Sequence, residues 1–157
     1  MIVRKPTNGI YVGTVKIGDY APVSIQSMIT TDPVHTEKAI AEINHLAEAG
    51  CELVRVAVPT MASAKALKAV RAGISIPLIA DIHFDYRLAL EAIENNVDGL
   101  RINPGNIGGE DKVLAVIEKA KPKQSQFALV LMQALYQSIF SMLMEDILQR
   151  MVWLKQL

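Results

Sequence analysis

The sequence predicts an α/β fold, namely the N-terminal half of a TIM-type (β/α) barrel, and three observations support this. After residue 22, short apolar runs alternate with segments whose apolar residues recur at helical spacing, an order that builds a parallel sheet. The apolar runs end in charged or amide residues, as expected where strand ends carry the chemistry. A complete eight-stranded barrel needs roughly 250 residues, so the 157 residues have room for about half of one.

The expected elements follow from apolar patterning and from turn residues. Gly13 separates two short strands, and Gly50 and Gly73 end two of the helices. We expect strands at 10–12, 14–17, 23–26, 53–58, 77–81 and 97–102, and helices at 36–49, 61–72, 86–95 and 110–120. A doubly wound sheet is the alternative, but it has little support because no G-x-G-x-x-G follows the first strand.

Composition narrows the function classes. The formal net charge is zero, so no basic field attracts nucleic acid non-specifically. The chain has one cysteine, Cys51, which excludes a disulfide framework and cannot hold a cluster or a structural zinc, so we expect no metal ligands. No signal peptide is evident at the N-terminus. We therefore expect a cytoplasmic protein that binds neither nucleic acid nor membrane.

The last fifth of the chain differs from the rest. Residues 125–157 contain no Gly or Pro and are dense in Met and Leu. Polar residues interrupt the apolar segment at 127–144, which disfavours a membrane span. We expect the strand–helix alternation to be lost here, so that residues 1–124 form a partial barrel domain and 125–157 an aberrant tail.

Asp81 and His83 form the first candidate site. They lie two residues apart at the end of an expected strand, so both side chains point to one face. There the imidazole could hydrogen-bond or transfer a proton, while the carboxylate orients it or binds a hydroxyl group of a substrate. The alternative is a structural carboxylate beside an ordinary histidine.

Arg55 and Arg101 form the second candidate site. Each lies inside an apolar strand, in ELVRVAVP and in GLRINPG, where a guanidinium is costly unless it is paired with an anion. Two such arginines on neighbouring strands indicate a phosphate or diphosphate ligand, because arginine binds these groups bidentately. The alternative is an Arg–Asp pair inside the barrel.

The loop at 103–109, NPGNIGG, offers amide side chains and backbone N–H groups ahead of a helix. That suits anion binding, although the loop lacks the Gly-Lys-Ser/Thr of a Walker motif. A plain turn between strand and helix is the alternative.

Four runs, APVSIQSM, CELVRVAVPT, PLIADIHFDYRLAL and GLRINPGNIG, resemble the 4-hydroxy-3-methylbut-2-enyl diphosphate synthase family (GcpE or IspG). The resemblance covers roughly residues 4–120. It implies a β/α barrel followed by a smaller domain that carries a [4Fe-4S] cluster. It also implies reductive ring opening of 2-C-methyl-D-erythritol 2,4-cyclodiphosphate, with removal of water, in non-mevalonate isoprenoid biosynthesis. The implied partners are a flavodoxin or ferredoxin electron donor and a second subunit of a homodimer.

The resemblance also implies roles for matching residues. Arg55 and Arg101 resemble diphosphate ligands, and Asp81 and His83 resemble catalytic groups that orient the substrate at the barrel mouth. Further residues implied to bind substrate are Asn103 and Asn106 in the loop, and Gln26 and Ser27 in the first-strand motif.

The tail departs from the family pattern, which continues with a strand near PIRIGVNAGSLPKH and ends in a domain with three cysteine ligands. Residues 126–139, QFALVLMQALYQSI, can be encoded by DNA whose shifted frame reads IRIGVNAGSLPKH. We hypothesise that the reading frame shifts between about Lys119 and Ser125. The cluster ligands are then absent, and we expect these 157 residues alone to be inactive.

Two other function classes remain open on sequence grounds. One is a nonenzymatic remnant of a damaged gene. The other is a different phosphate-binding barrel enzyme, such as a pterin-dependent synthase, although the ADIHF and RINPGNIG runs argue against it.

Overall fold

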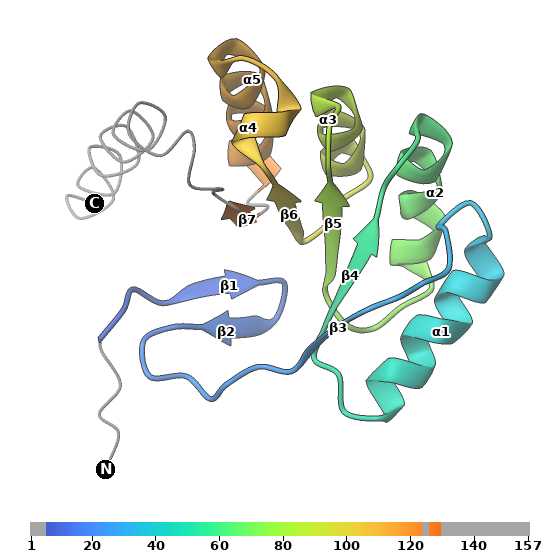
Figure 1. The fold of residues 1–157 in the computed structure, drawn as a ribbon. Coiled ribbons are helices and arrows are strands. Elements are labelled where there is room, and N and C mark those ends of the chain that lie inside the picture. The colour runs from blue at the N-terminus through green and yellow to red at the C-terminus, as the bar shows by residue number, and fades with distance from the viewer. Residues whose placement is uncertain (1–5, 124–125, 130–157) are drawn as a thin grey trace.

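The computed structural model describes residues 6–123 and 126–129. The strands are β1 (Ile10–Val12), β2 (Val15–Ile17), β3 (Gln26–Met28), β4 (Leu53–Ala57), β5 (Leu78–Ile82), β6 (Gly99–Ile102) and β7 (Gln126–Leu129). The helices are α1 (Thr36–Glu48), α2 (Met61–Ala72), α3 (Tyr86–Glu94), α4 (Pro104–Ile107) and α5 (Glu110–Ala120), with a 3₁₀ turn at Lys121–Lys123. Figure 1 shows their arrangement.

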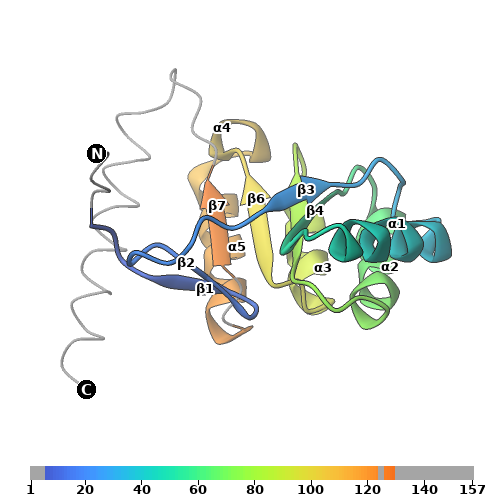
Figure 2. The ribbon, with the colours of Figure 1, turned by 90° about the horizontal axis from the view of Figure 1, so that it is seen from below.

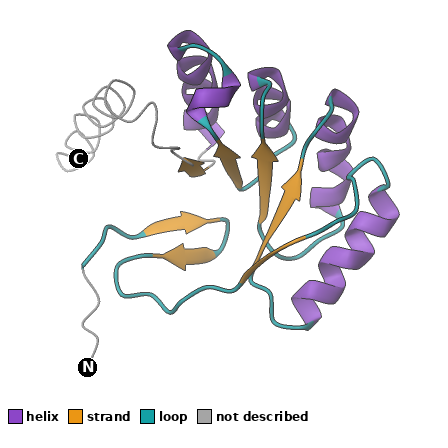
Figure 3. Cartoon of the chain, viewed as in Figure 1, coloured by secondary structure: helices purple, strands orange, loops and turns teal. Residues whose placement is uncertain are grey.

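The main sheet confirms the predicted fold class. Its five strands are parallel and lie in sequence order, β3-β4-β5-β6-β7. The helices α1, α2, α3 and α5 follow successive strands and gather on one side of the sheet (Figures 1 and 3). Sequential parallel strands with helices on the outside are the arrangement of a β/α barrel wall.

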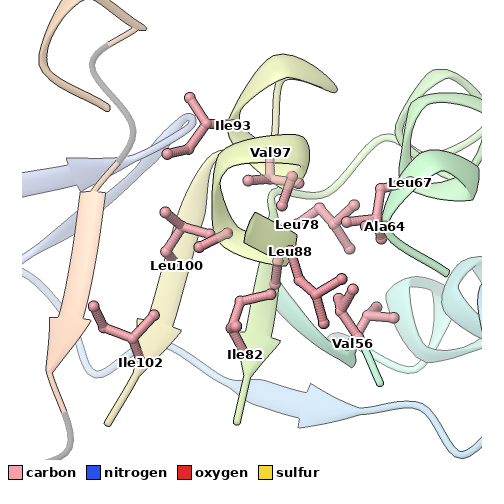
Figure 4. Packing of buried hydrophobic residues seen from close by; sticks show 14 of the residues in the cluster. Val56, Ala64, Leu67, Leu78, Ile82, Leu88, Ile93, Val97, Leu100 and Ile102 are labelled. Atoms are coloured by element: carbon pink, nitrogen blue, oxygen red, sulfur yellow. The ribbon is translucent and has the colours of Figure 1, made fainter. Parts of the chain in front are cut away.

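One face of the sheet forms the main hydrophobic core with these helices. Val56, Leu78 and Leu100 are fully buried on three neighbouring strands. Figure 4 shows these strand residues packing with side chains such as Leu67 of α2 and Leu88 of α3. Fully burying such a side chain contributes about 1.5–3 kcal/mol, so this face anchors the strands.

The opposite face of the sheet, which would be the barrel interior, is apolar at the amino ends of the strands and polar at their carboxyl ends. The hairpin β1–β2 packs against the starts of the strands, where Val12 meets Leu53 and Ile79 in a second, smaller apolar cluster. Its turn residue Gly13 has φ +55° and lies against Pro77. Figure 2 shows the hairpin beside the sheet, away from the helices. The hairpin thus covers the amino end of the strands and leaves the carboxyl end to the polar residues.

The predicted first barrel strand is displaced in the chain. We expected it at 23–26, whereas β3 spans Gln26–Met28, and Val23 and Ile25 before it are exposed. The reason is the partner strand: β4 begins at Leu53, which pairs with Gln26. The apolar residues at 23–25 therefore did not show at which residue the pairing with β4 begins.

We expected the strand–helix alternation to end at residue 125, but this prediction is wrong for Gln126–Leu129, which form a further strand. The strand β7 pairs in parallel with β6, with Leu100 opposite Phe127 and Ile102 opposite Leu129. The remainder of the predicted tail, residues 130–157, lies outside the described residues. The domain boundary at 124 and the frameshift therefore stay predictions. Within 6–123 and 126–129, no helix is long and apolar enough to cross a bilayer.

Candidate functional site

The candidate site lies at the carboxyl ends of β4, β5 and β6, on the face away from the helices. In the parallel register, Asp81 of β5 lies between Ala57 of β4 and Arg101 of β6. Arg55 is two residues before Ala57 and shares its face, because side chains alternate along a strand. The two arginines are therefore not on neighbouring strands, as the sequence analysis expected, but on β4 and β6 on either side of β5, and the register brings both towards one carboxylate (strands in Figure 1).

The Asp81 carboxylate is held between the two guanidinium groups. Arg101 Nη1 donates a hydrogen bond to Asp81 Oδ1 at 2.6 Å. Arg55 Nε lies 3.2 Å from Asp81 Oδ2, but its N–H group is not aligned for a hydrogen bond. Arg55 Nε is therefore a buried nitrogen without a hydrogen-bond partner among the described residues. The contact of Arg55 is thus an attraction between charges. The Asp81 side chain is 2% exposed, whereas those of Arg55 and Arg101 are 30% and 26% exposed.

This arrangement suits an incoming anion. Two guanidinium groups and one carboxylate leave a net charge of one positive unit, and a single carboxylate cannot accept all the N–H donors of two arginines. Both arginine side chains are partly exposed, so a ligand can approach them from solvent. The Arg–Asp pair that the sequence analysis left open is present, and it is compatible with anion binding.

His83 follows the end of β5 and extends the same site outward. Its Nε2 lies 3.8 Å from Asp81 Oδ1, and its side chain is 48% exposed. The spacing of two residues did predict that the two side chains lie together. The imidazole therefore stands between the buried carboxylate and solvent, where a ligand can reach it.

The loop after β6 contributes the predicted amide residues. The backbone carbonyl of Asn103 accepts hydrogen bonds from the N–H groups of Asn106 at 3.0 Å and Ile107 at 3.1 Å. Asn103 is half-buried at the end of β6, whereas Asn106 is exposed on α4. Asn103 therefore lies next to the arginine site along its own strand, and Asn106 lies one turn further out.

Gln26 and Ser27 do not share a face, although the sequence analysis placed both at the mouth. Gln26 is in register with Leu53, and the next residue of that face, Met28, is in register with Arg55. Ser27 is in register with Val54, which belongs to the helix-side core. Alternation along the strand thus favours Gln26 for the interior face, and the register does not support Ser27 as a residue of the mouth.

Sequence reasoning missed two residues near the site. Met28 lies beside Arg55, with its Sδ 3.4 Å from Arg55 Nη2. Lys112, in the first turn of α5, places its Nζ 5.8 Å from the centre of the Tyr86 ring. A positive residue shortly after a glycine-rich loop was a visible signal, but the sequence could not show that it reaches the neighbouring helix α3.

The described residues do not fit an iron–sulfur cluster. Cys51 is the one cysteine of the chain, and it is buried with its Sγ 3.0 Å from the backbone oxygen of Leu53. Within the described part of the chain, no three His, Cys, Asp or Glu side chains are grouped to hold a metal ion. A cluster needs several thiolate ligands, and these residues cannot supply them.

Comparison with known proteins shows which family the chain resembles. A sequence model of the GcpE TIM-barrel domain matches residues 7–130. The chain is 56% identical over 123 residues to a protein of Maridesulfovibrio salexigens and 56% identical over 124 residues to one of Thermodesulfovibrio yellowstonii. It is 51% identical over 122 residues to one of Shewanella sp. strain ANA-3. All three relatives are named 4-hydroxy-3-methylbut-2-en-1-yl diphosphate synthase (flavodoxin).

These matches cover 78%, 79% and 78% of this chain but 34%, 36% and 33% of the relatives, respectively. The chain therefore spans about a third of the length of the curated relatives that it matches. Because the domain match covers well over half of the 157 residues, the chain belongs to the GcpE family.

Proposed function

We propose that this chain supplies the diphosphate-binding part of a 4-hydroxy-3-methylbut-2-enyl diphosphate synthase. The observation that carries the proposal is the pair of partly exposed arginine side chains, Arg55 and Arg101, on either side of the buried Asp81 carboxylate. Arg55 and Arg101 would bind the diphosphate through hydrogen bonds assisted by charge. The names of the relatives specify a diphosphate product, which agrees with such a site.

Asp81 has a positioning role in this proposal. Both its oxygens face guanidinium groups, and its side chain is 2% exposed, so it is poorly placed to exchange a proton with a substrate. It fixes the two arginines before the ligand arrives, which lowers the cost of ordering them. The exposed imidazole of His83 is the group that can hydrogen-bond to a substrate oxygen or transfer a proton to it.

The reaction that we propose for the whole enzyme is the ring opening of 2-C-methyl-D-erythritol 2,4-cyclodiphosphate. Two electrons and two protons are consumed, one C–O bond to the diphosphate breaks, and one hydroxyl leaves as water. The family resemblance implies a [4Fe-4S] cluster and a homodimer, and the relatives' names indicate flavodoxin as the electron donor. We extend this donor, and a cytoplasmic location, to the enzyme of which these residues are a part.

The 157 residues contain one cysteine, which is too few to hold a cluster. We propose that this chain binds the diphosphate but does not turn over by itself. Turnover of the cyclodiphosphate by the purified chain with a reduced electron donor would contradict that statement.

Calorimetric titration of the chain with inorganic pyrophosphate tests the binding site. We expect Arg101→Met to raise Kd by at least about tenfold, because a hydrogen bond to a charged group contributes about 1.5–3 kcal/mol. The matched control is Arg71→Met, since Arg71 also pairs with a carboxylate, Asp98, but at the opposite end of the strands. Equal losses in the two variants, or undiminished binding by Arg101→Met, would refute the site.

A further inference from the structure

Two loops at the carboxyl end of the sheet carry candidate ligand-binding groups. The β5–α3 loop begins with His83, and the segment between β6 and α5 begins with Asn103 and contains Asn106. The two loops belong to consecutive βα units, and backbone hydrogen bonds within the sheet end at Ile82 and Ile102. A contact outside the sheet must therefore set the relative position of the two loops if both are to bind one ligand.

Lys112 contacts the loop after β6 and Tyr86, the first residue of the helix that follows the β5–α3 loop. A Cβ built on Gly108 would lie 3.0 Å from Lys112 Nζ and would overlap the Cδ of the same side chain. The aliphatic part of Lys112 therefore lies directly on the Gly108 backbone, whose φ of +123° few other residues adopt. Its ammonium lies 5.8 Å from the centre of the Tyr86 ring, at the start of α3.

Asp85 adds a negative charge to the β5–α3 loop. Asp85 caps α3 by accepting a hydrogen bond from Arg87 N. Hydrogen bonds from the Arg87 side chain and backbone hold the pKa of Asp85 below its usual value, and the positive charge of Lys112 contributes a smaller lowering. The Lys112 ammonium is thus attracted by the Asp85 carboxylate of the β5–α3 loop and by the face of the Tyr86 ring that follows it. The Lys112 methylene groups pack on Gly108 in the other loop.

We propose that Lys112 is a positioning residue that holds the Asn103–Gly109 loop against the β5–α3 loop, so that the amides and His83 face one ligand. This inference rests on the proposed function. Lys112 acts through the loop and does not itself contact the diphosphate. Removal of the Lys112 charge raises Kd by more than the accompanying loss of folding stability can explain.

The chain offers a matched control on the same helix. Lys119, near the other end of α5, forms an ion pair with Glu94 at the end of α3. Both lysines therefore connect α5 with α3, but Lys112 does so at the loops of the site and Lys119 at the far end. Lys112→Met and Lys119→Met each remove one charge and keep most of the side-chain volume.

The experiment is calorimetric titration of the full 157-residue chain and its variants with 3-methylbut-2-enyl diphosphate, with urea unfolding in parallel. We expect Lys112→Met to raise Kd by roughly 3–10-fold, as for a coupling of about 1 kcal/mol, and Lys119→Met to change Kd by less than about twofold. Gly108→Ala should raise Kd similarly, and the double variant Gly108→Ala/Lys112→Met should show no additional loss, because both changes break one contact.

The outcomes separate the inference from the proposed function. If the unaltered chain binds neither 3-methylbut-2-enyl diphosphate nor pyrophosphate, the proposed function fails and the inference fails with it. If the unaltered chain binds and Lys112→Met has the Kd of Lys119→Met, the inference alone is overturned. Additive losses in the double variant, or a weaker salt dependence of Kd in Lys112→Met, would overturn it in favour of direct contact with the anion.

Discussion

Replacing Asp81 by Asn tests whether this carboxylate is the counter-ion that holds the two arginines together. The side chain is 2% exposed and faces Arg55 Nε at 3.2 Å and Arg101 Nη1 at 2.6 Å. Removing one member of a buried ion pair costs about 3–5 kcal/mol, because the remaining charge is left uncompensated. Both arginine side chains are between a quarter and a third exposed, so screening by water lowers the cost to about 3 kcal/mol.

The second part of this prediction concerns the ligand. Without the carboxylate, the net charge of the cluster rises from one to two positive units, and we expect this stronger attraction for an anion to exceed the added cost of ordering the two arginines without Asp81. Pyrophosphate at about 100 times its Kd stabilises a protein by about 2.7 kcal/mol, and a tenfold lower Kd in Asp81→Asn would add about 1.4 kcal/mol. Pyrophosphate should therefore stabilise Asp81→Asn by about 4.1 kcal/mol and the unaltered chain by about 2.7 kcal/mol, so that about half of the stability lost relative to the unaltered chain returns.

Urea unfolding followed by circular dichroism, with and without pyrophosphate, measures both effects. Asp98→Asn is the control, because Asp98 also pairs with an arginine, with Arg71 Nε 2.8 Å from its Oδ2, and accepts a hydrogen bond from Leu78 N. Asp98→Asn should lose stability without selective recovery in pyrophosphate. The reasoning is refuted if Asp81→Asn is as stable as the unaltered chain, or if pyrophosphate stabilises the two variants equally.

Three further predictions follow from the structure. Arg55→Lys should weaken pyrophosphate binding by about tenfold in calorimetry, since lysine cannot bind in the bidentate geometry of arginine; retention of affinity would contradict this. Hydrogen bonds from Thr31 and Thr30 lower the pKa of Glu42, so the stability it contributes is present above its unfolded pKa near 4.5 and is lost as pH falls through the lower folded value. Urea midpoints from pH 7 to pH 2.5 should therefore decline less steeply for Glu42→Gln, and parallel declines would argue against this role. Gly50 has φ +96° and nothing within 4 Å of a built Cβ, so Gly50→Ala should cost about 1–2 kcal/mol through backbone strain alone, measured by the same unfolding experiment; an unchanged midpoint would contradict it.

The elements themselves follow largely from local sequence. Helical spacing of apolar residues placed α2 at Met61–Ala72 and α5 at Glu110–Ala120, as the structure has them. These two predictions are correct because each helix buries one apolar stripe, a pattern that is present in the sequence of the helix itself. The edges of strands are less well determined, as β3 shows, because a strand begins where its neighbour offers hydrogen-bond partners.

The sequence by itself determined the parallel βα order and the chemical types of the site residues, including two arginines within apolar strands, where a guanidinium needs an anion. Only the tertiary structure decided which residues meet. The register set Asp81 beside Arg101 and within reach of Arg55, and it turned Ser27 towards the helices. The packing of α5 beside α3 brought Lys112 over the ring of Tyr86, which belongs to the preceding βα unit. The physical reason is that strand register and helix packing depend on distant partners, whereas periodicity and residue chemistry are properties of each local segment.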